Sequence, residues 1–168
     1  MRKYKGAGIA LFKKQNNDYA ILLGKRTIKP NKGKWSIPGG GFEQSDNSLF
    51  VTAIRELREE TGIDLSLTEQ DAVICSFHYP FFEWKTFMFE VDSDFHVPER
   101  FCYEFSEIKF ISLKDIHQYK LAFGVRKEIN HFKKRYQKKQ SAQVHISFMH
   151  LSRIADYFHA GPSVMHWK

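Results

Sequence analysis

Short apolar runs separated by polar, turn-forming residues dominate the first part of the chain and predict β-strands. Residues 8–12 and 19–23 are two such runs, and the polar segment 13–18 between them predicts a hairpin. Glycine and proline punctuate residues 24–34, which we expect to form a loop before a short strand at 35–37. Further strand-like runs follow at residues 72–79, 84–91 and 109–113.

The pattern changes to helical spacing at residues 49–61, where the apolar residues recur on one face and are expected to be buried. The segment 45–48 offers N-capping side chains, and Gly62 stands where a left-handed C-cap belongs. A basic helix is predicted at 124–139. This order of strands, central helix, strands and helix indicates a mixed α/β or α+β domain. The apolar face of the central helix consists of Leu49, Phe50, Ala53, Ile54 and Leu57.

Length and composition agree with one globular domain. The 168 residues are 42% hydrophobic and include 16 phenylalanines, which supplies enough apolar surface for a core and excludes global disorder. Cys75 and Cys102 are too few for a disulfide framework or a zinc cage and favour a reducing compartment, with Cys75 a small core residue. No apolar run approaches the ~20 residues of a membrane span, so we expect a cytoplasmic protein without a membrane partner.

Charge is distributed unevenly along the chain, whose formal net charge is +7. Residues 1–34 carry +9, residues 35–108 carry −11 and residues 109–168 carry +9. An acidic middle between basic segments suits a divalent cation that lies next to phosphate groups. The basic segment 133–139 leaves RNA as a weaker alternative partner.

Three carboxylates converge on the predicted central helix. Glu56, Glu59 and Glu60 stand at i, i+3 and i+4, so they share an arc of roughly 100° beside the apolar face. Like charges at this spacing destabilise a helix unless a cation compensates them. Arg55 and Arg58 are expected to project to the other side. The competing interpretation is an ordinary acidic surface paired with Arg and Lys.

A glycine-rich segment, Trp35-Ser36-Ile37-Pro38-Gly39-Gly40-Gly41, lies just before the acidic helix, and we expect its glycines to form a tight loop. Glycine lets the backbone approach a ligand closely. A backbone carbonyl together with several carboxylates makes an all-oxygen site, which suits Mg²⁺ or Mn²⁺ rather than zinc.

Together these two segments resemble the Nudix box, Gly-x5-Glu-x7-Arg-Glu-U-x-Glu-Glu-x-Gly-U, in which U is aliphatic. Residues 55–63 match its second half, and the Trp-x-Ile-Pro-Gly-Gly run resembles the family's lead-in. The resemblance, closest to MutT-like and nucleotide-sugar-processing members, implies an αβα sandwich with a mixed sheet over residues 1–140. We expect the remaining residues, 141–168, to form an extension that packs on this domain or at a homodimer interface.

The resemblance implies a Mg²⁺-dependent hydrolase, with Mn²⁺ as the alternative ion. Its substrate would be a nucleoside diphosphate linked to another group, such as a nucleoside triphosphate or a nucleotide sugar. Carried onto this sequence, Glu59 and Glu60 are metal ligands, Glu56 is a ligand or the general base, and the carbonyl of Gly40 is the backbone ligand. Arg55 is expected to orient a carboxylate by a salt bridge.

Further site residues follow from the same resemblance. A loop glutamate joins the metal site in such proteins, and Glu107 is favoured over Glu104 for this role. Arg26 is expected to bind a substrate phosphate, with a surface ion pair as the alternative. Trp35 and Tyr79 are the aromatic candidates for substrate binding, against the alternative of core packing. Tyr79 belongs to an aromatic cluster with His78, Phe81, Phe82 and Trp84.

One position departs from the box. If the box starts at Gly41, its first glutamate position holds Asn47, which cannot supply a charge. If it starts at Gly40, that position holds Asp46, and the next spacer has eight residues instead of seven. Both registers stay open. Asn47 also favours a rival function, a non-catalytic nucleotide sensor, and an RNA-directed pyrophosphohydrolase is a second rival.

Overall fold

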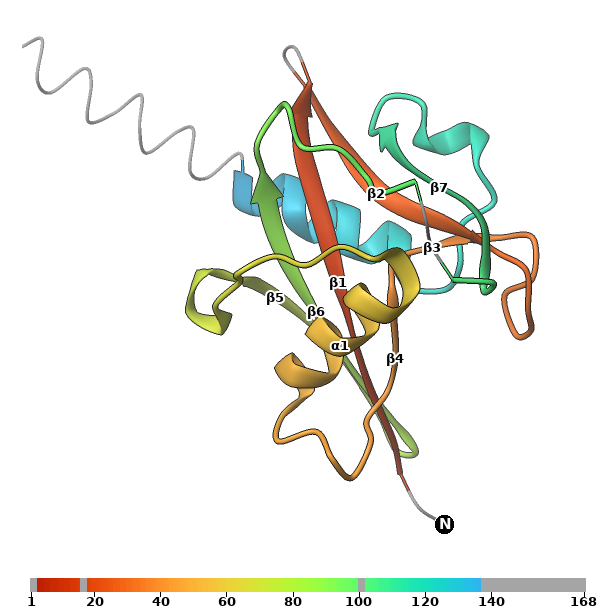
Figure 1. The fold of residues 1–168 in the computed structure, drawn as a ribbon, viewed down its shortest axis with the longest axis vertical. Helices are drawn as coiled ribbons and strands as arrows, with labels where there is room; N and C mark the ends of the chain where they lie inside the picture. Colours follow the sequence, from red (N-terminus) through yellow and green to blue (C-terminus); the bar gives the residue numbers. More distant parts are fainter. Residues whose placement is uncertain (1–2, 16–17, 100–101, 137–168) are drawn as a thin grey trace, which may run out of the picture. The chain divides into compact units, whose positions relative to one another are not determined.

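The computed structural model describes residues 3–15, 18–99 and 102–136. The chain divides into two units, Met1–His131 and Phe132–Lys168. The sheet and the helix α1 belong to the first (Figure 1), and so do the residues that line the cavity described below. The strands are β1 (Tyr4–Gln15), β2 (Asp18–Arg26), β3 (Trp35–Ser36), β4 (Gly39–Gly41), β5 (Val73–Tyr79), β6 (Phe82–Val91) and β7 (Phe105–Ser112). The helical elements are α1 (Leu49–Thr61), two 3₁₀ turns at Glu69–Asp71 and Ile116–Gln118, and residues 125–136.

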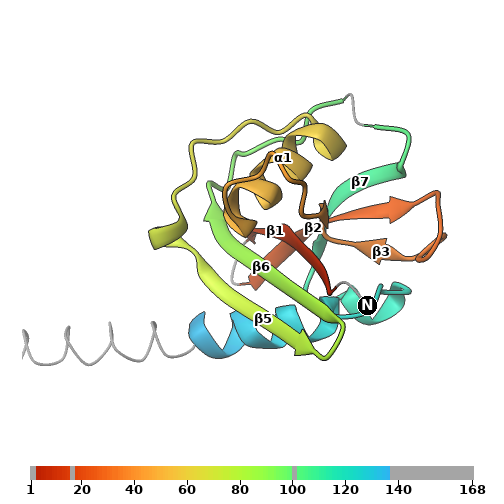
Figure 2. The same cartoon turned by 90° about the horizontal axis from the view of Figure 1, so that it is seen from below.

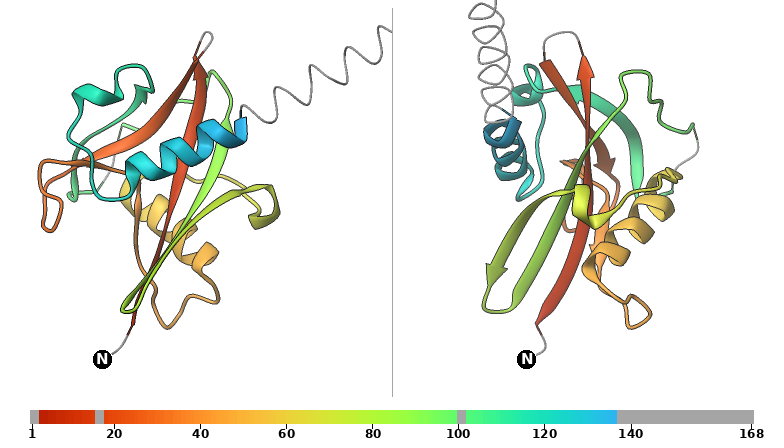
Figure 3. Two further views of the ribbon diagram at one scale, coloured as in Figure 1. Left: turned by 180° about the vertical axis from the view of Figure 1, so that it is seen from behind. Right: turned by 90° about the vertical axis from the view of Figure 1, so that its left-hand side faces the viewer.

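The seven strands form one mixed sheet. Its main path runs β3-β2-β1-β6-β5, with β4 paired to β1 and β7 paired to β2. The β1–β6 pair is parallel and the other pairs are antiparallel. The views in Figures 2 and 3 place α1 on one face of this sheet and helical residues 125–131 on the other. This arrangement confirms the predicted αβα sandwich.

The central strand β1 is buried along eight consecutive residues, 6–13, because both faces of the sheet are covered. On the α1 side, Leu57 and Ala53 pack with Ile9 and Phe87 in the hydrophobic core. Each of these four side chains is at most 1% exposed. Phe50 adds an edge-to-face contact with Phe87 at 5.1 Å between ring centroids. Packing of the apolar face of α1 therefore fixes the position of its acidic border relative to β1.

The boundaries of α1 agree with the sequence prediction. The Ser48 side chain accepts a hydrogen bond from Val51 N at 3.2 Å, and Gly62 adopts the left-handed conformation with φ 69°. The Gly62 N–H donates to the Arg58 carbonyl, which completes the C-terminal cap. Both ends are set by local residues, the Ser48 side chain and the Gly62 backbone, so the helix cannot shift in register without losing a cap.

The glycines 39–41, expected as a loop, form the strand β4 against β1. A Cβ at Gly39 would lie 2.6 Å from the carbonyl oxygen of Ala7 and from the Cα of Gly8, so only glycine permits this approach. Close packing of two backbones overrides the weak strand propensity of glycine. Residues 137–139 of the predicted basic helix and the extension 141–168 lie outside the described residues. Within the described ranges, no helix has the length and apolarity needed to cross a membrane.

Candidate functional site

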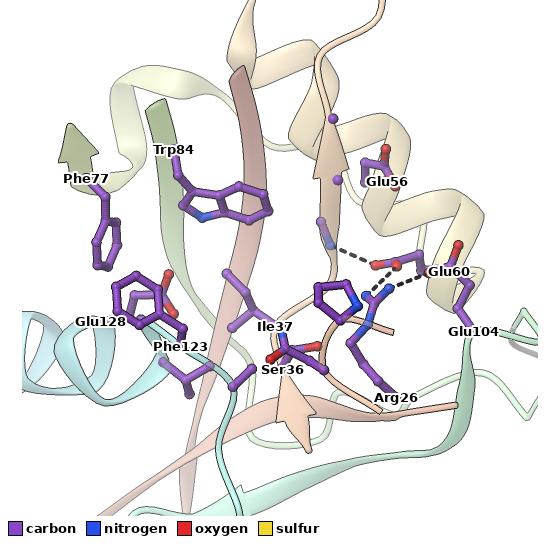
Figure 4. Close-up of a pocket in the computed structure, with 18 of the residues that line it drawn as sticks. Arg26, Ser36, Ile37, Glu56, Glu60, Phe77, Trp84, Glu104, Phe123 and Glu128 are labelled. Atoms are coloured by element: carbon purple, nitrogen blue, oxygen red, sulfur yellow. Dashed lines mark hydrogen bonds and ion pairs between the residues drawn. The ribbon is translucent and has the colours of Figure 1, made fainter. Parts of the chain in front are cut away.

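Glu60 and Glu56 border a cavity between α1 and the sheet (Figure 4). Glu60 is 3% exposed, and its Oε2 accepts a hydrogen bond of 2.7 Å from the Gly39 N–H. The nearest arginine nitrogen, Arg26 Nη1, lies 3.6 Å from Glu60 Oε1. Burial raises the pKa of Glu60 to about 8 and also raises the pKa of Glu56. These carboxylates are therefore held in a place where their negative charge is only partly compensated.

The glycine ribbon β4 makes this placement feasible. β4 pairs with β1, and α1 packs over the same strand, so the backbone of β4 runs beside Glu56 and Glu60. A Cβ at Gly40 would collide with the Glu56 carboxylate. Because glycine removes that obstacle, a side-chain carboxylate and a backbone strand share the same edge of the cavity.

Arg55 lies on the same side as the carboxylates, so the expectation that it projects away was wrong. Its Nη1 donates to Glu56 Oε1 at 2.9 Å and to Glu59 Oε2 at 3.0 Å, while Nη2 donates to the Gly41 carbonyl at 3.0 Å. Helical spacing describes the direction of Cβ, whereas the long arginine side chain reaches back across a turn. The salt bridges expected of Arg55 are present.

Asp46 anchors Arg55. It is 6% exposed, and its carboxylate accepts from the Arg55 guanidinium at 3.1–3.2 Å, from Thr52 Oγ1 at 2.9 Å and from the Glu43 N–H at 3.0 Å. The hydrogen bond from Arg55 is the main reason that the pKa of Asp46 falls to about 2. Asn47 is exposed. The structure therefore puts a fixed negative charge at Asp46, bound to the arginine of the acidic helix.

The cavity beside these groups has a volume of about 470 Å³, within the usual range for small-molecule sites. Figure 4 shows Glu56, Glu60, Glu104 and Arg26 on one side of it, and Phe77, Phe123 and Glu128 on the opposite side. Trp84 and Ile37 lie between the two groups. We call the first group the carboxylate side and the second the aromatic side.

Arg26 lines the carboxylate side at the end of β2, where it pairs with Glu104. Of the two loop glutamates considered for the metal site, Glu104 lines the cavity and the favoured Glu107 does not. Arg26 Nη2 donates to Glu104 Oε2 at 2.8 Å, and both residues line the cavity. Glu107 lies on β7, where its Oε1 is 2.6 Å from Lys109 Nζ. The register of β7 against β2, which pairs Arg26 with Phe105, brings the preceding Glu104 to the cavity.

Trp35 and Tyr79 are not among the residues that line the described cavity. Trp35 is 6% exposed and packs edge-on against Tyr119 at 5.4 Å between ring centroids. Tyr79 is 52% exposed beside the turn between β5 and β6. From the same aromatic cluster, Phe82 and Trp84 do line the cavity. Cys75 is buried in β5, as expected for a small core residue.

The donor set fits a hard divalent cation. Glu56 and Glu60 offer carboxylate oxygens at the cavity, and the Gly40 backbone passes beside Glu56, whereas the cavity lining contains neither His nor Cys. Glu59, the third carboxylate of α1, has a side chain that is 58% exposed and is not among the residues that line the cavity. Among residues 3–15, 18–99 and 102–136, no group of three His, Cys, Asp or Glu side chains is already arranged around one point. Arg55 pairs with two of the helix carboxylates, Glu56 and Glu59. A cation would compensate the buried charge whose cost is visible in the raised pKa values of Glu56 and Glu60.

Sequence reasoning missed Glu128 and its partner Thr86, both fully buried at the aromatic side. One signal was present: Glu128 stands between Val125 and Ile129 on the apolar face of a basic helix, where an acidic residue is unexpected. Its partner Thr86 lies 42 positions earlier in β6, a separation that local patterns do not bridge.

Comparison with known proteins places this geometry in a family. The family model described as NUDIX domain matches residues 3–132. Nudix hydrolase 22, chloroplastic, of Arabidopsis thaliana is 40% identical over 63 residues, 36% of this chain and 21% of that protein. The ADPR responsive transcriptional repressor NtrR of Acinetobacter baylyi is 39% identical over 67 residues, 39% of this chain and 27% of that protein. The chain thus spans about a quarter of the length of these relatives.

A solved structure with the same fold is the bifunctional NMN adenylyltransferase/ADP ribose pyrophosphatase of Francisella tularensis, complexed with AMP and a manganese ion. Its TM-score is 0.64 at 22% identity, over 79% of this chain and 42% of that one. At this identity the likeness concerns the fold.

Proposed function

The chain belongs to the Nudix family, and from that membership we propose that it is a divalent-cation-dependent pyrophosphohydrolase. The proposed substrate is a nucleoside diphosphate linked to another group. The observation that carries this proposal is the pair of carboxylates, buried Glu60 and partly buried Glu56, beside a cavity that also presents Arg26. Such a concentration of charge in a concave site is costly for the fold and is typical of a functional site.

Glu56, Glu59 and Glu60, with the carbonyl of Gly40, are the groups proposed to hold Mg²⁺ or Mn²⁺. When bound, such a cation neutralises phosphate charge and makes water a better nucleophile. The Gly39 N–H and Arg26 fix the Glu60 carboxylate at the edge of the cavity. Glu60 is thereby preorganised as an anchor and does not have to be ordered when the substrate arrives.

Glu56 is the proposed general base. It lines the cavity, and Arg55 holds its Oε1 at 2.9 Å. Burial raises the pKa of Glu56, and a carboxylate with a raised pKa takes a proton from water more readily than an ordinary glutamate. Arg55 is itself fixed by Asp46, so this pair sets the position of the base.

Arg26 is proposed to bind the pyrophosphate. Its side chain lies at the cavity, and its buried Nε is without a hydrogen-bond partner among the described residues. The Nε–H is thus a donor available to a phosphate oxygen. The aromatic lining suits the planar heterocycle of a nucleotide. AMP in the Francisella tularensis structure supports a nucleotide ligand for this fold.

A substrate panel tests the proposal. ADP-ribose, nucleoside triphosphates, dinucleoside polyphosphates and nucleotide sugars are incubated with the protein in Mg²⁺, in Mn²⁺ and in excess chelator, and phosphate and nucleotide release are measured. We expect release from at least one compound with metal and none with chelator. Glu60→Gln should abolish it, whereas Glu90→Gln, on β6 and bonded to Tyr19, should retain it. Full activity in chelator would overturn the proposal.

Arg55 favours a second candidate function, nucleotide sensing without catalysis. Its guanidinium already occupies two of the three carboxylates on α1, and one relative is an ADPR responsive transcriptional repressor. A sensor would bind nucleotide with or without metal and release no product. The same panel, combined with calorimetric binding, separates the two functions.

A further inference from the structure

Three buried polar atoms have no hydrogen-bond partner within the described part of the chain: Arg26 Nε, Ser36 Oγ and Glu128 Oε2. All three residues line the same cavity. Buried polar groups in folded proteins are nearly always paired, because an unpaired one costs about 1–3 kcal/mol. Their concentration in one cavity indicates that polar atoms of a ligand complete these bonds. Arg26 lies on the carboxylate side, whereas Glu128 lies on the aromatic side.

Glu128 is held in a defined orientation. It is 2% exposed, and its Oε1 accepts a hydrogen bond from Thr86 Oγ1. Thr86 Oγ1 in turn accepts from Trp84 Nε1 at 3.0 Å, so the hydroxyl proton of Thr86 is directed to Glu128. This chain of donors satisfies Oε1 and leaves Oε2 as the open acceptor.

The walls around Glu128 are apolar and aromatic. Phe77 and Phe123 have ring centroids 6.3 Å apart, and both line the cavity with Trp84. Gly124, with φ 94°, lets the chain turn tightly here: a Cβ on it would lie 3.3 Å from the Phe77 ring and 3.9 Å from Glu128 Oε1. Phe123 is 74% exposed, so one face of its ring is accessible to a ligand. One oriented acceptor among aromatic rings is the chemistry that recognises a planar heterocycle through an N–H group.

We propose that Glu128, held by Thr86, is the specificity-determining residue of a nucleobase subsite that selects heterocycles carrying an exocyclic amino group. This inference rests on the proposed function, since the pyrophosphate on the carboxylate side directs the base to the opposite side. An amino group donates to Oε2 and pairs it. A carbonyl at the same position of the base presents an acceptor to an acceptor, leaves Oε2 unpaired and is rejected.

Binding of matched nucleotide pairs tests the subsite. The α,β-methylene analogues of ADP and IDP differ in an amino or oxo group at one ring position, and so do those of CDP and UDP. Their affinities are measured by calorimetry with Mg²⁺ at pH 8. Burial raises the pKa of Glu128 to about 7, so its carboxylate is ionised at this higher pH. We expect the amino member of each pair to bind at least about tenfold more tightly than the oxo member.

Glu128→Gln should reduce each preference to about threefold or less, or invert it, because the amide also offers an N–H₂ donor to an oxo group. Glu90→Gln, a matched change on β6 away from the cavity, should keep the wild-type preference. Melting temperatures of all three proteins establish that they are folded. The wild-type comparison itself needs no variant.

Two results would overturn the subsite: equal affinity of wild-type protein for both members of each pair, or an equal loss of affinity for all four analogues in Glu128→Gln. The proposed hydrolysis is contradicted by a different result from the one that contradicts the subsite. Amino-selective binding without metal-dependent product release contradicts the hydrolase and retains the subsite. Metal-dependent release without selectivity retains the hydrolase and removes the subsite.

Discussion

The two sides of the cavity bury carboxylates in different ways. On the carboxylate side, Glu60 has a backbone N–H at 2.7 Å and Arg26 at 3.6 Å, and Glu56 has Arg55 at 2.9 Å. On the aromatic side, Glu128 has one hydroxyl, from Thr86. Arginines that pair with the carboxylates mark the first region as a place for phosphate and metal charge. In the second region Glu128 has no ion pair among the described residues, and the neighbouring Lys127, whose Nζ lies 4.2 Å from the centroid of the Phe77 ring, only partly offsets its burial. The surroundings of a buried carboxylate, and not its charge alone, therefore determine which kind of ligand each side of the cavity suits.

The largest expected effect is on catalysis at the carboxylate side. Glu60→Gln removes the proposed metal anchor and should lower kcat by about 10²–10⁴-fold, the range associated with loss of a catalytic acid–base or related group. The fold should remain, because the amide retains an oxygen for the Gly39 N–H and no longer buries a charge. Steady-state kinetics and a melting curve measure both. A wild-type kcat in Glu60→Gln would contradict the assignment of catalysis to the carboxylate side.

The next effect concerns stability and pH on the aromatic side. Burial raises the pKa of Glu128 to about 7, well above the usual value for glutamate, so the folded state favours the protonated form. Between pH 5 and 7 the unfolded state is deprotonated while the folded state keeps its proton, and stability therefore falls as pH rises through this window. Glu128→Gln should escape this loss.

The stability of Glu128→Gln relative to wild-type protein should increase by about 3 kcal/mol between pH 5 and 8, since one pKa unit corresponds to about 1.4 kcal/mol. Urea denaturation at several pH values measures it. Glu90→Gln, at an exposed position, is the control and should show little pH dependence relative to wild type. A parallel pH profile for Glu128→Gln and wild type would contradict the buried, weakly compensated carboxylate.

The anchor of the carboxylate side can be broken at Asp46. Asp46→Asn removes the charge that holds Arg55. It also weakens the hydrogen bonds that the buried Asp46 carboxylate accepts from Arg55, Thr52 and the Glu43 N–H. We expect a loss of about 1–3 kcal/mol in the free energy of unfolding, together with slower turnover because Glu56 loses its orientation. Asn47→Ala, at the exposed neighbour, should change stability by no more than about 0.5 kcal/mol. Equal effects of the two changes would contradict the register that puts the charge at Asp46.

The smallest effect tests how far the carboxylate side depends on the start of α1. Ser48→Ala removes the N-cap bond to Val51 and should cost about 1 kcal/mol. Ser45→Ala, at an exposed position outside the helix, is the control. Because Glu56 lies about two turns and Glu60 about three turns further on, kcat should change little. A large loss of activity at unchanged stability would mean that the helix start acts on the site directly.

The two sides also differ in how far the sequence predicts them. Helix α1 was predicted with its bounds because its caps and apolar spacing are local signals. The glutamates that it carries stand within five residues of one another, so their convergence follows from helical geometry. Glu128 and Thr86, in contrast, meet only because β6 lies beside β1 and the helical residues 125–131 cover that face.

Three expectations for the carboxylate side depended on contacts that the sequence does not show. Arg55 was expected to point away because helical spacing describes Cβ, and Glu107 was favoured over Glu104 because the register of β7 against β2 is not visible in the sequence. Gly39–Gly41 was expected as a loop because propensity cannot express the close approach of two backbones. Tertiary packing decided each of these positions.

Manganese uptake tests the central difference between the two sides most directly. The signal of free Mn²⁺ is followed by electron paramagnetic resonance during titration of wild-type protein, Glu60→Gln and Glu128→Gln. We expect wild-type protein and Glu128→Gln to take up the ion with similar affinity, and Glu60→Gln to take up little. Equal uptake by all three proteins, or loss of uptake only in Glu128→Gln, would contradict the assignment of the metal to the carboxylate side.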